Sequence, residues 1–71
     1  MIDLAKNKRE IIRVRQREYG GYRYIDARIF FPGDDGEMRP VKQGVTIALD
    51  RAGELAAAIE QVARQEAPDD D

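Results

Sequence analysis

Two runs of alternating residues, separated by a Gly-Gly pair, constrain the fold more than any other feature of this sequence. Residues 12–17 read Ile-Arg-Val-Arg-Gln-Arg, so a strand here points apolar side chains to one face and arginines to the other. Residues 22–31 alternate in the same way and are rich in aromatic and β-branched residues. Gly20 and Gly21 allow the positive φ angles that tight hairpin turns require. The pattern predicts an antiparallel β-hairpin.

The two faces of this hairpin differ in chemistry. The apolar face of the second run holds Ile25, Ala27 and Ile29. Its other face holds Tyr22, Tyr24, Asp26, Arg28 and Phe30. Like charges on one strand face, as at Arg13, Arg15 and Arg17, repel one another unless something neutralises them. The sequence leaves two interpretations open: ion pairs with Asp26, Glu18 or helix carboxylates, or a surface that binds an anionic ligand.

The rest of the chain completes one small domain. A turn at residues 32–36 precedes a run over 37–42, which Pro40 makes an edge or bulged strand. Residues 45–49 alternate again. Their predicted inward-facing side chains are Val45, Ile47 and Leu49.

An amphipathic helix follows. Asp50 is predicted as its N-cap, Leu55, Ile59 and Val62 form its apolar stripe, and it should end near Glu66. The expected fold is α+β: a curved four-stranded antiparallel sheet followed by one C-terminal helix (β-β-β-β-α) packed on it. We divide the chain into an N-terminal arm at 1–10, a domain at 11–66 and an acidic disordered tail at 67–71.

Composition excludes several classes of protein. The 71 residues include no His, Cys or Ser, which removes the usual zinc ligands, disulfides and thiol or serine nucleophiles. We therefore expect no enzyme, no metal and no cofactor. No apolar run reaches ~18 residues, and residues 1–9 are polar, so we expect no membrane span or secretory signal and a cytoplasmic protein. So short a chain has a small core, which favours a homodimer.

Charge is distributed unevenly along the chain. Residues 1–28 hold eight basic and four acidic residues, whereas residues 29–71 hold four basic and ten acidic ones. This asymmetry indicates an anionic partner for the first part, although a solvated charged surface is the alternative. The turn acids Asp34, Asp35 and Glu37 lack calcium-loop spacing. The acidic tail is a hypothetical competitor of that anionic partner for the basic residues.

The stretches over residues 24–31 and 36–49 resemble a known family. They read Tyr-Ile-Asp-Ala-Arg-Ile-Phe-Phe and Gly-Glu-Met-Arg-Pro-Val-Lys-Gln-Gly-Val-Thr-Ile-Ala-Leu. The C-terminal domain of the transcriptional coactivator positive cofactor four, with its bacterial relatives, has a similar order of motifs over what corresponds to residues 11–66. The resemblance implies a homodimer whose curved sheets form channels for single-stranded or melted DNA.

The resemblance also implies site residues. Arg28 matches a strand arginine, Phe31 a base-stacking tryptophan and Arg39 a lysine. Lys42 lies in a basic pair whose second member is replaced by Gln43, and Tyr19 and Tyr22 stand for a stacking phenylalanine and a hairpin lysine. The full candidate set for nucleic-acid binding is Arg13, Arg15, Arg17, Tyr19, Tyr22, Arg28, Phe31, Arg39 and Lys42.

One assignment has two interpretations. Phe30 and Phe31 are adjacent, so alternation places them on opposite faces of the strand. Phe31 is two residues after Ile29 and shares its apolar face, and this parity argument makes Phe31 the core residue. The resemblance instead makes Phe31 the stacking residue, and we adopt that assignment.

The expected function is single-stranded DNA binding with little sequence preference. It would act in transcription regulation, in a coactivator-like role with the transcription machinery as a possible partner, or on melted DNA. Aromatic side chains stack on any base, and a positive groove binds the phosphates, so neither contact distinguishes one base from another. The alternatives are a protein-interaction module or small regulatory subunit that binds an acidic partner, and an RNA-binding protein.

Overall fold

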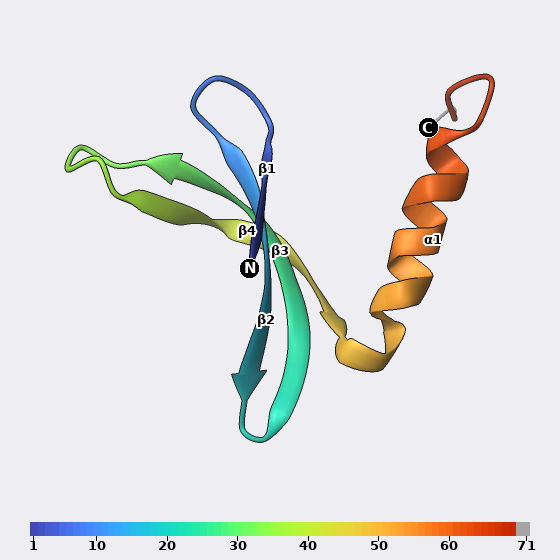
Figure 1. The fold of residues 1–71 in the computed structure, drawn as a ribbon, viewed down its shortest axis with the longest axis horizontal. Helices are drawn as coiled ribbons and strands as arrows, with labels where there is room; N and C mark the ends of the chain where they lie inside the picture. Colours follow the sequence, from blue (N-terminus) through green and yellow to red (C-terminus); the bar gives the residue numbers. More distant parts are fainter. Residues whose placement is uncertain (70–71) are drawn as a thin grey trace.

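A single antiparallel sheet and one helix make up the fold of the computed structural model, which describes residues 1–69. The sheet order is β1-β2-β3-β4, and a short 3₁₀ turn leads to the helix (Figure 1). The elements are β1 (Ile2–Ala5), β2 (Ile11–Tyr19), β3 (Tyr22–Pro32), β4 (Met38–Ala48), η1 (Leu49–Arg51) and α1 (Ala52–Ala63). The predicted α+β class and β-β-β-β-α order are confirmed, although the strands differ in part from those expected.

The predicted hairpin is formed by β2 and β3. Their register is unbroken from Ile11 opposite Phe30 to Tyr19 opposite Tyr22. Gly20 and Gly21 have φ angles of 56° and 87°, the two positive values that a type I′ turn needs. The Gly-Gly pair therefore fixes which residues face one another along the whole hairpin.

Ile2–Ala5 form a strand within the stretch predicted to be a flexible or partly ordered N-terminal arm. β1 pairs with β2 so that Ile2 lies opposite Val14 and Leu4 opposite Ile12. Apolar residues thus oppose apolar residues across the two strands, which favours pairing. The side chain of Asn7 fixes the connecting loop, since its Oδ1 accepts hydrogen bonds from the backbone N–H of Glu10 at 2.8 Å and from a neighbouring N–H.

β4 joins the two runs that the sequence suggested as separate strands. Its register against β3 shifts between Arg28, which lies opposite Gly44, and Phe30, which lies opposite Pro40. The shift places extra β4 residues against β3, as a bulge does, and a bulge bends its strand. Gly44 is required there, because a Cβ at this position would lie 2.8 Å from the Cβ of Arg28.

The helix departs from expectation in three ways. Asp50 is not its N-cap, because η1 contains this residue and Arg51 takes the cap position without a side-chain hydrogen bond. The helix ends at Ala63 instead of near Glu66. It also stands away from the sheet instead of packing on it (Figure 1). Within residues 1–69, no helix is long and apolar enough to cross a membrane.

The core of the protomer is very small. Among residues 1–69, only Phe30 and Asp26 are buried, with 4% and 2% of their surface exposed. The predicted inward orientation of Val45 and Leu49 does not bury them, since they are 52% and 36% exposed. No element within residues 1–69 covers that side of the sheet. Of the predicted tail, residues 67–69 are exposed, and Asp70 and Asp71 lie outside the described residues.

Candidate nucleic-acid interface

The register of β2 against β3 gathers charged and aromatic side chains on one face of the sheet. Residues directly opposite each other in an antiparallel pair point to the same side. We call this side the arginine–tyrosine face; it comprises Arg13, Arg15, Arg17 and Tyr19 of β2, and Tyr22, Tyr24, Asp26, Arg28 and Phe30 of β3. The two-faced hairpin predicted from the alternation is therefore confirmed. Six of the nine candidate residues lie on this face: Arg13, Arg15, Arg17, Tyr19, Tyr22 and Arg28.

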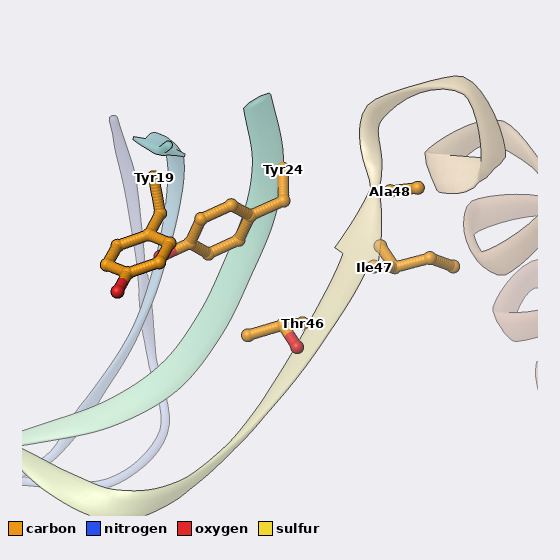
Figure 2. A pocket seen from close by; sticks show the side chains of 5 residues that line it. All are labelled: Tyr19, Tyr24, Thr46, Ile47 and Ala48. Carbon is orange, nitrogen blue, oxygen red and sulfur yellow. The ribbon is translucent and has the colours of Figure 1, made fainter. Parts of the chain in front are cut away.

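The hairpin tip presents the most accessible aromatic side chains of this face. Tyr19 and Tyr22 are 82% and 80% exposed, and they lie opposite each other beside the turn. Tyr19 and Tyr24 also line one open pocket of about 360 Å³, with Thr46 of β4 across from them (Figure 2). Arg17 lies opposite Tyr24 and forms no ion pair within the described part of the chain. The tip thus combines uncovered aromatic rings with an uncompensated guanidinium.

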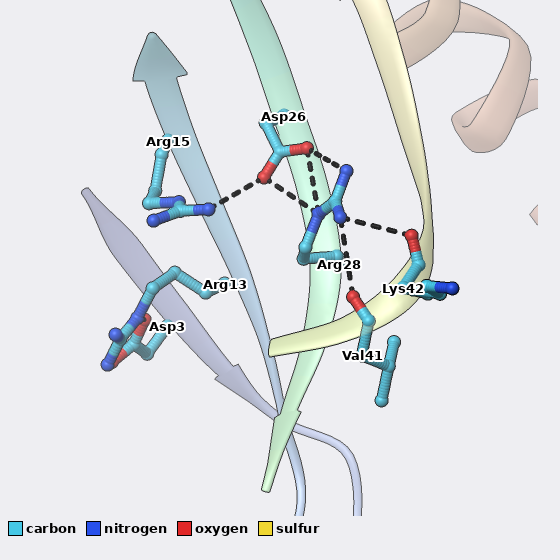
Figure 3. A network of polar contacts seen from close by, with 7 residues as sticks. All are labelled: Asp3, Arg13, Arg15, Asp26, Arg28, Val41 and Lys42. Carbon is cyan, nitrogen blue, oxygen red and sulfur yellow. Dashed lines mark hydrogen bonds and ion pairs between the residues drawn. The ribbon is translucent and has the colours of Figure 1, made fainter. Parts of the chain in front are cut away.

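A buried carboxylate occupies the centre of the face. Asp26 accepts hydrogen bonds from Arg28 Nη2 at 2.6 Å and from Arg15 Nη2 at 3.0 Å (Figure 3). Burial raises the pKa of the Asp26 carboxyl, but the hydrogen bonds and positive charges of Arg28 and Arg15 outweigh it and hold the pKa below its ordinary value. The interpretation of ion pairing with Asp26 is therefore correct for Arg15.

Arg28 uses most of its donors inside the protein. Besides Asp26, it donates from Nη1 to the backbone carbonyls of Val41 at 3.3 Å and Lys42 at 3.2 Å. Its side chain is 22% exposed, and Gly44 makes room for it over β4. Arg28 therefore ties β3 to the bulged part of β4, and only its outer edge remains available to a ligand.

Arg13 pairs with a residue that the sequence did not suggest. Its Nε and Nη2 donate to the Asp3 carboxylate at 2.8 and 3.0 Å. Its guanidinium also lies over the Phe30 ring, 4.5 Å from the centroid, and the Arg15 guanidinium lies 5.0 Å from the same ring. Asp3 could have been found only by recognising residues 2–5 as a strand that pairs with β2.

Comparison with known proteins identifies the family. The sequence pattern of the family described as Transcriptional Coactivator p15 (PC4) matches residues 6–58. The chain belongs to the PC4 family. No curated protein sequence matches it.

Two solved PC4 homologues have similar structures. The chain is 28% identical to BPSL1147 of Burkholderia pseudomallei, with a TM-score of 0.84, over 92% of this chain and 88% of that one. It is 25% identical to a bacteriophage T5 homologue of PC4, with a TM-score of 0.69, over 86% of this chain and 72% of that one. The T5 protein is implicated in recombination-dependent DNA replication. The PC4 family is one of DNA-binding proteins that act in transcription or in such replication.

Two of the remaining PC4-type candidates, Phe31 and Arg39, lie away from the arginine–tyrosine face. Phe31 is opposite Arg39 in the ladder, and alternation puts both on the other side of the sheet from Phe30. Phe30 is buried and Phe31 is 38% exposed, so the resemblance, and not the parity argument, assigned the core residue correctly. Arg39 pairs with Asp35 at 2.7 Å. Lys42 is exposed and has no ion pair within residues 1–69.

Proposed function

We propose that this PC4-family protein binds single-stranded DNA with little sequence preference, and that the hairpin tip and the arginine–tyrosine face form the binding surface. The observation that carries the proposal is the pair Tyr19 and Tyr22, each about four-fifths exposed, next to Arg17, which forms no ion pair within residues 1–69. Single-strand binding surfaces combine stacking platforms with positive charge that follows the phosphates. Arginine suits such a surface because its planar group pairs with phosphate and also stacks on bases.

Stacking supplies more of the expected affinity than charge does. Four arginines and the two aspartates Asp3 and Asp26 leave the face a net charge of +2, and the whole chain carries −2. Stacking contributes ~1–3 kcal/mol per base, so two tyrosines outweigh so modest a charge. Duplex DNA hides its base faces and offers mainly phosphates, which favour basic proteins. These magnitudes favour single strands over duplex.

We further propose that the protein acts as a homodimer. The apolar side of the sheet is uncovered, with Ile2 65%, Leu4 51% and Val45 52% exposed. The helix is uncovered as well, with Ile59 61% and Val62 54% exposed. Apolar surfaces of this extent mark interfaces, and a second copy would cover both at once. Light scattering coupled to size-exclusion chromatography should give twice the 8.1 kDa chain mass.

The proposed role is in transcription regulation or in the handling of melted DNA. The experiment is a fluorescence-anisotropy titration of a labelled ~20-nucleotide oligo-dT at two salt concentrations, with unlabelled duplex and RNA as competitors. Tight binding that salt weakens and duplex displaces poorly supports the proposal. If RNA displaces the labelled oligo-dT at a lower concentration than DNA does, the preferred ligand is RNA. An absence of binding at low salt would refute a nucleic-acid function.

A further inference from the structure

A carboxylate of the N-terminal strand forms an ion pair with one of the arginines of the proposed binding surface. Asp3 receives two parallel hydrogen bonds from Arg13, at 2.8 and 3.0 Å. The two side chains lie together beside β1 and β2 in Figure 3. Carboxylate and phosphate groups offer a guanidinium the same two-oxygen fork. In the free protein, Asp3 therefore stands where a phosphate oxygen pair would bind Arg13.

We propose that Arg13 is a phosphodiester-binding site that Asp3 of the same chain occupies in the free protein and vacates when a nucleic-acid strand binds. The inference rests on the proposed function and adds to it an internal competitor. Asp3 thereby sets the affinity of the surface.

The pair can open at small cost because it is near the edge of the molecule. The Asp3 side chain is 38% exposed, and it belongs to a four-residue strand at the edge of the sheet. Among residues 1–69, Asp3 has no side-chain hydrogen bond except those from Arg13. When it leaves Arg13, water can solvate the released carboxylate. The competition is therefore that of an exposed ion pair, which is weak.

The second carboxylate of the face cannot exchange in this way. Asp26 is only 2% exposed and is held by two arginines. Releasing it would leave a buried charge without a partner, which is strongly unfavourable. The structure thus distinguishes one replaceable carboxylate, Asp3, from one that is structural.

Arg13 remains positioned for a phosphate after Asp3 leaves. Its guanidinium rests on the ring of Phe30, which is itself buried. Only 19% of the Arg13 side chain is exposed, so few rotamers are open to it. A preorganised cation loses less conformational entropy on binding a ligand. The hydrogen bonds from Arg13 also lower the pKa of the Asp3 carboxyl, which keeps the competitor ionised at neutral pH.

The test compares Asp3→Asn with a variant that changes net charge equally. Glu54→Gln is the matched control, because Glu54 forms an exposed ion pair with Arg51 at 2.9 Å near the start of α1. With oligo-dT as the probe, Asp3→Asn should bind about two- to fivefold more tightly than Glu54→Gln at low salt, the factor that an exposed pair is worth. The gain should shrink as salt rises, because salt screens the pair that is lost.

Arg13→Gln locates the effect. In this background Asp3→Asn should bind oligo-dT no more tightly than Glu54→Gln does, because Asp3 no longer has a guanidinium to pair with. In the wild-type protein, the carboxyl carbon resonance of Asp3 should shift when oligo-dT saturates the protein, and this observation does not depend on any variant.

Several results would overturn the inference while the proposed function stands. They are equal binding by Asp3→Asn and Glu54→Gln, weaker binding by Asp3→Asn, a gain that persists in the Arg13→Gln background, and an Asp3 resonance that does not move. If the wild-type protein binds no oligo-dT, the proposed function itself fails. The two failures are thus distinguished within one titration series.

Discussion

Removing the charge of Asp26 should destabilise the protein more than any other conservative change on the arginine–tyrosine face. Asp26→Asn keeps the shape of the side chain but leaves Arg15 and Arg28 facing a neutral amide. Removing one partner of a buried ion pair lowers the free energy of unfolding by about 3–5 kcal/mol. The two arginines keep 24% and 22% exposure, so water solvates them in part and the lower end, about 3 kcal/mol, is expected.

This loss is large for so short a chain. A domain of this size has a total stability of roughly 4–10 kcal/mol, and each kcal/mol moves its melting temperature by about 4–8 °C. Circular dichroism at one fixed protein concentration should therefore show a fall in Tm of about 12–24 °C. The control is Asp35→Asn, which removes the pair with Arg39, whose side chains are 52% and 55% exposed. That change should cost less than about 1 kcal/mol.

The Asp26 carboxylate also makes the stability of the protein fall at low pH. Because the pKa of Asp26 is lower in the folded protein than its ordinary 3.8, its contribution is complete at pH values above 3.8. It is lost as the pH falls through the lower folded pKa, and Asp26→Asn should lack this part of the acid transition. Equal Tm shifts for Asp26→Asn and Asp35→Asn, or an unchanged acid profile, would show that the buried Asp26 carboxylate does not stabilise the fold.

Three further predictions concern binding, the core and assembly. Tyr19→Ala should weaken oligo-dT binding by about 1–3 kcal/mol in an anisotropy titration and leave Tm nearly unchanged, since the ring is exposed; a matching loss of Tm would argue against a stacking role. Phe30→Ala should cost about 3–5 kcal/mol in urea unfolding because its ring is buried, whereas Phe31→Ala should cost under about 1 kcal/mol; the reverse order would restore the parity assignment. Ile59→Asp should convert the dimer to monomer in light scattering, and a dimer that persists would place the interface elsewhere.

The hairpin was predictable because every local signal in it agrees. The alternation of β2 and β3, the Gly20-Gly21 turn and the β-branched and aromatic residues all specify the same two strands. Phe30 and Phe31 could not be assigned by parity alone. Parity assumes that the Ile25, Ala27 and Ile29 side of the sheet is the buried one, whereas the protomer buries the opposite side.

The errors have a common physical origin. β1 has only four residues, so its alternation is too short to distinguish a strand from an arm. Asp50 has the residue type of an N-cap, but the 3₁₀ turn that contains it is set by how the chain leaves β4. The helix stripe and Val45 do carry apolar surface, yet no element within residues 1–69 covers it. Sequence patterns report which residues are apolar, and not which chain buries them.

The hairpin tip and the arginine–tyrosine face together form the proposed binding surface for single-stranded DNA. The most direct measurement follows backbone amide resonances of the ¹⁵N-labelled protein during titration with oligo-dT. We expect saturable shifts at the amides of Arg17, Tyr19 and Tyr22, with residues 54–63 of α1 unaffected. Shifts confined to α1 or to the apolar side of the sheet, with the hairpin tip unmoved, would contradict this assignment of the binding surface.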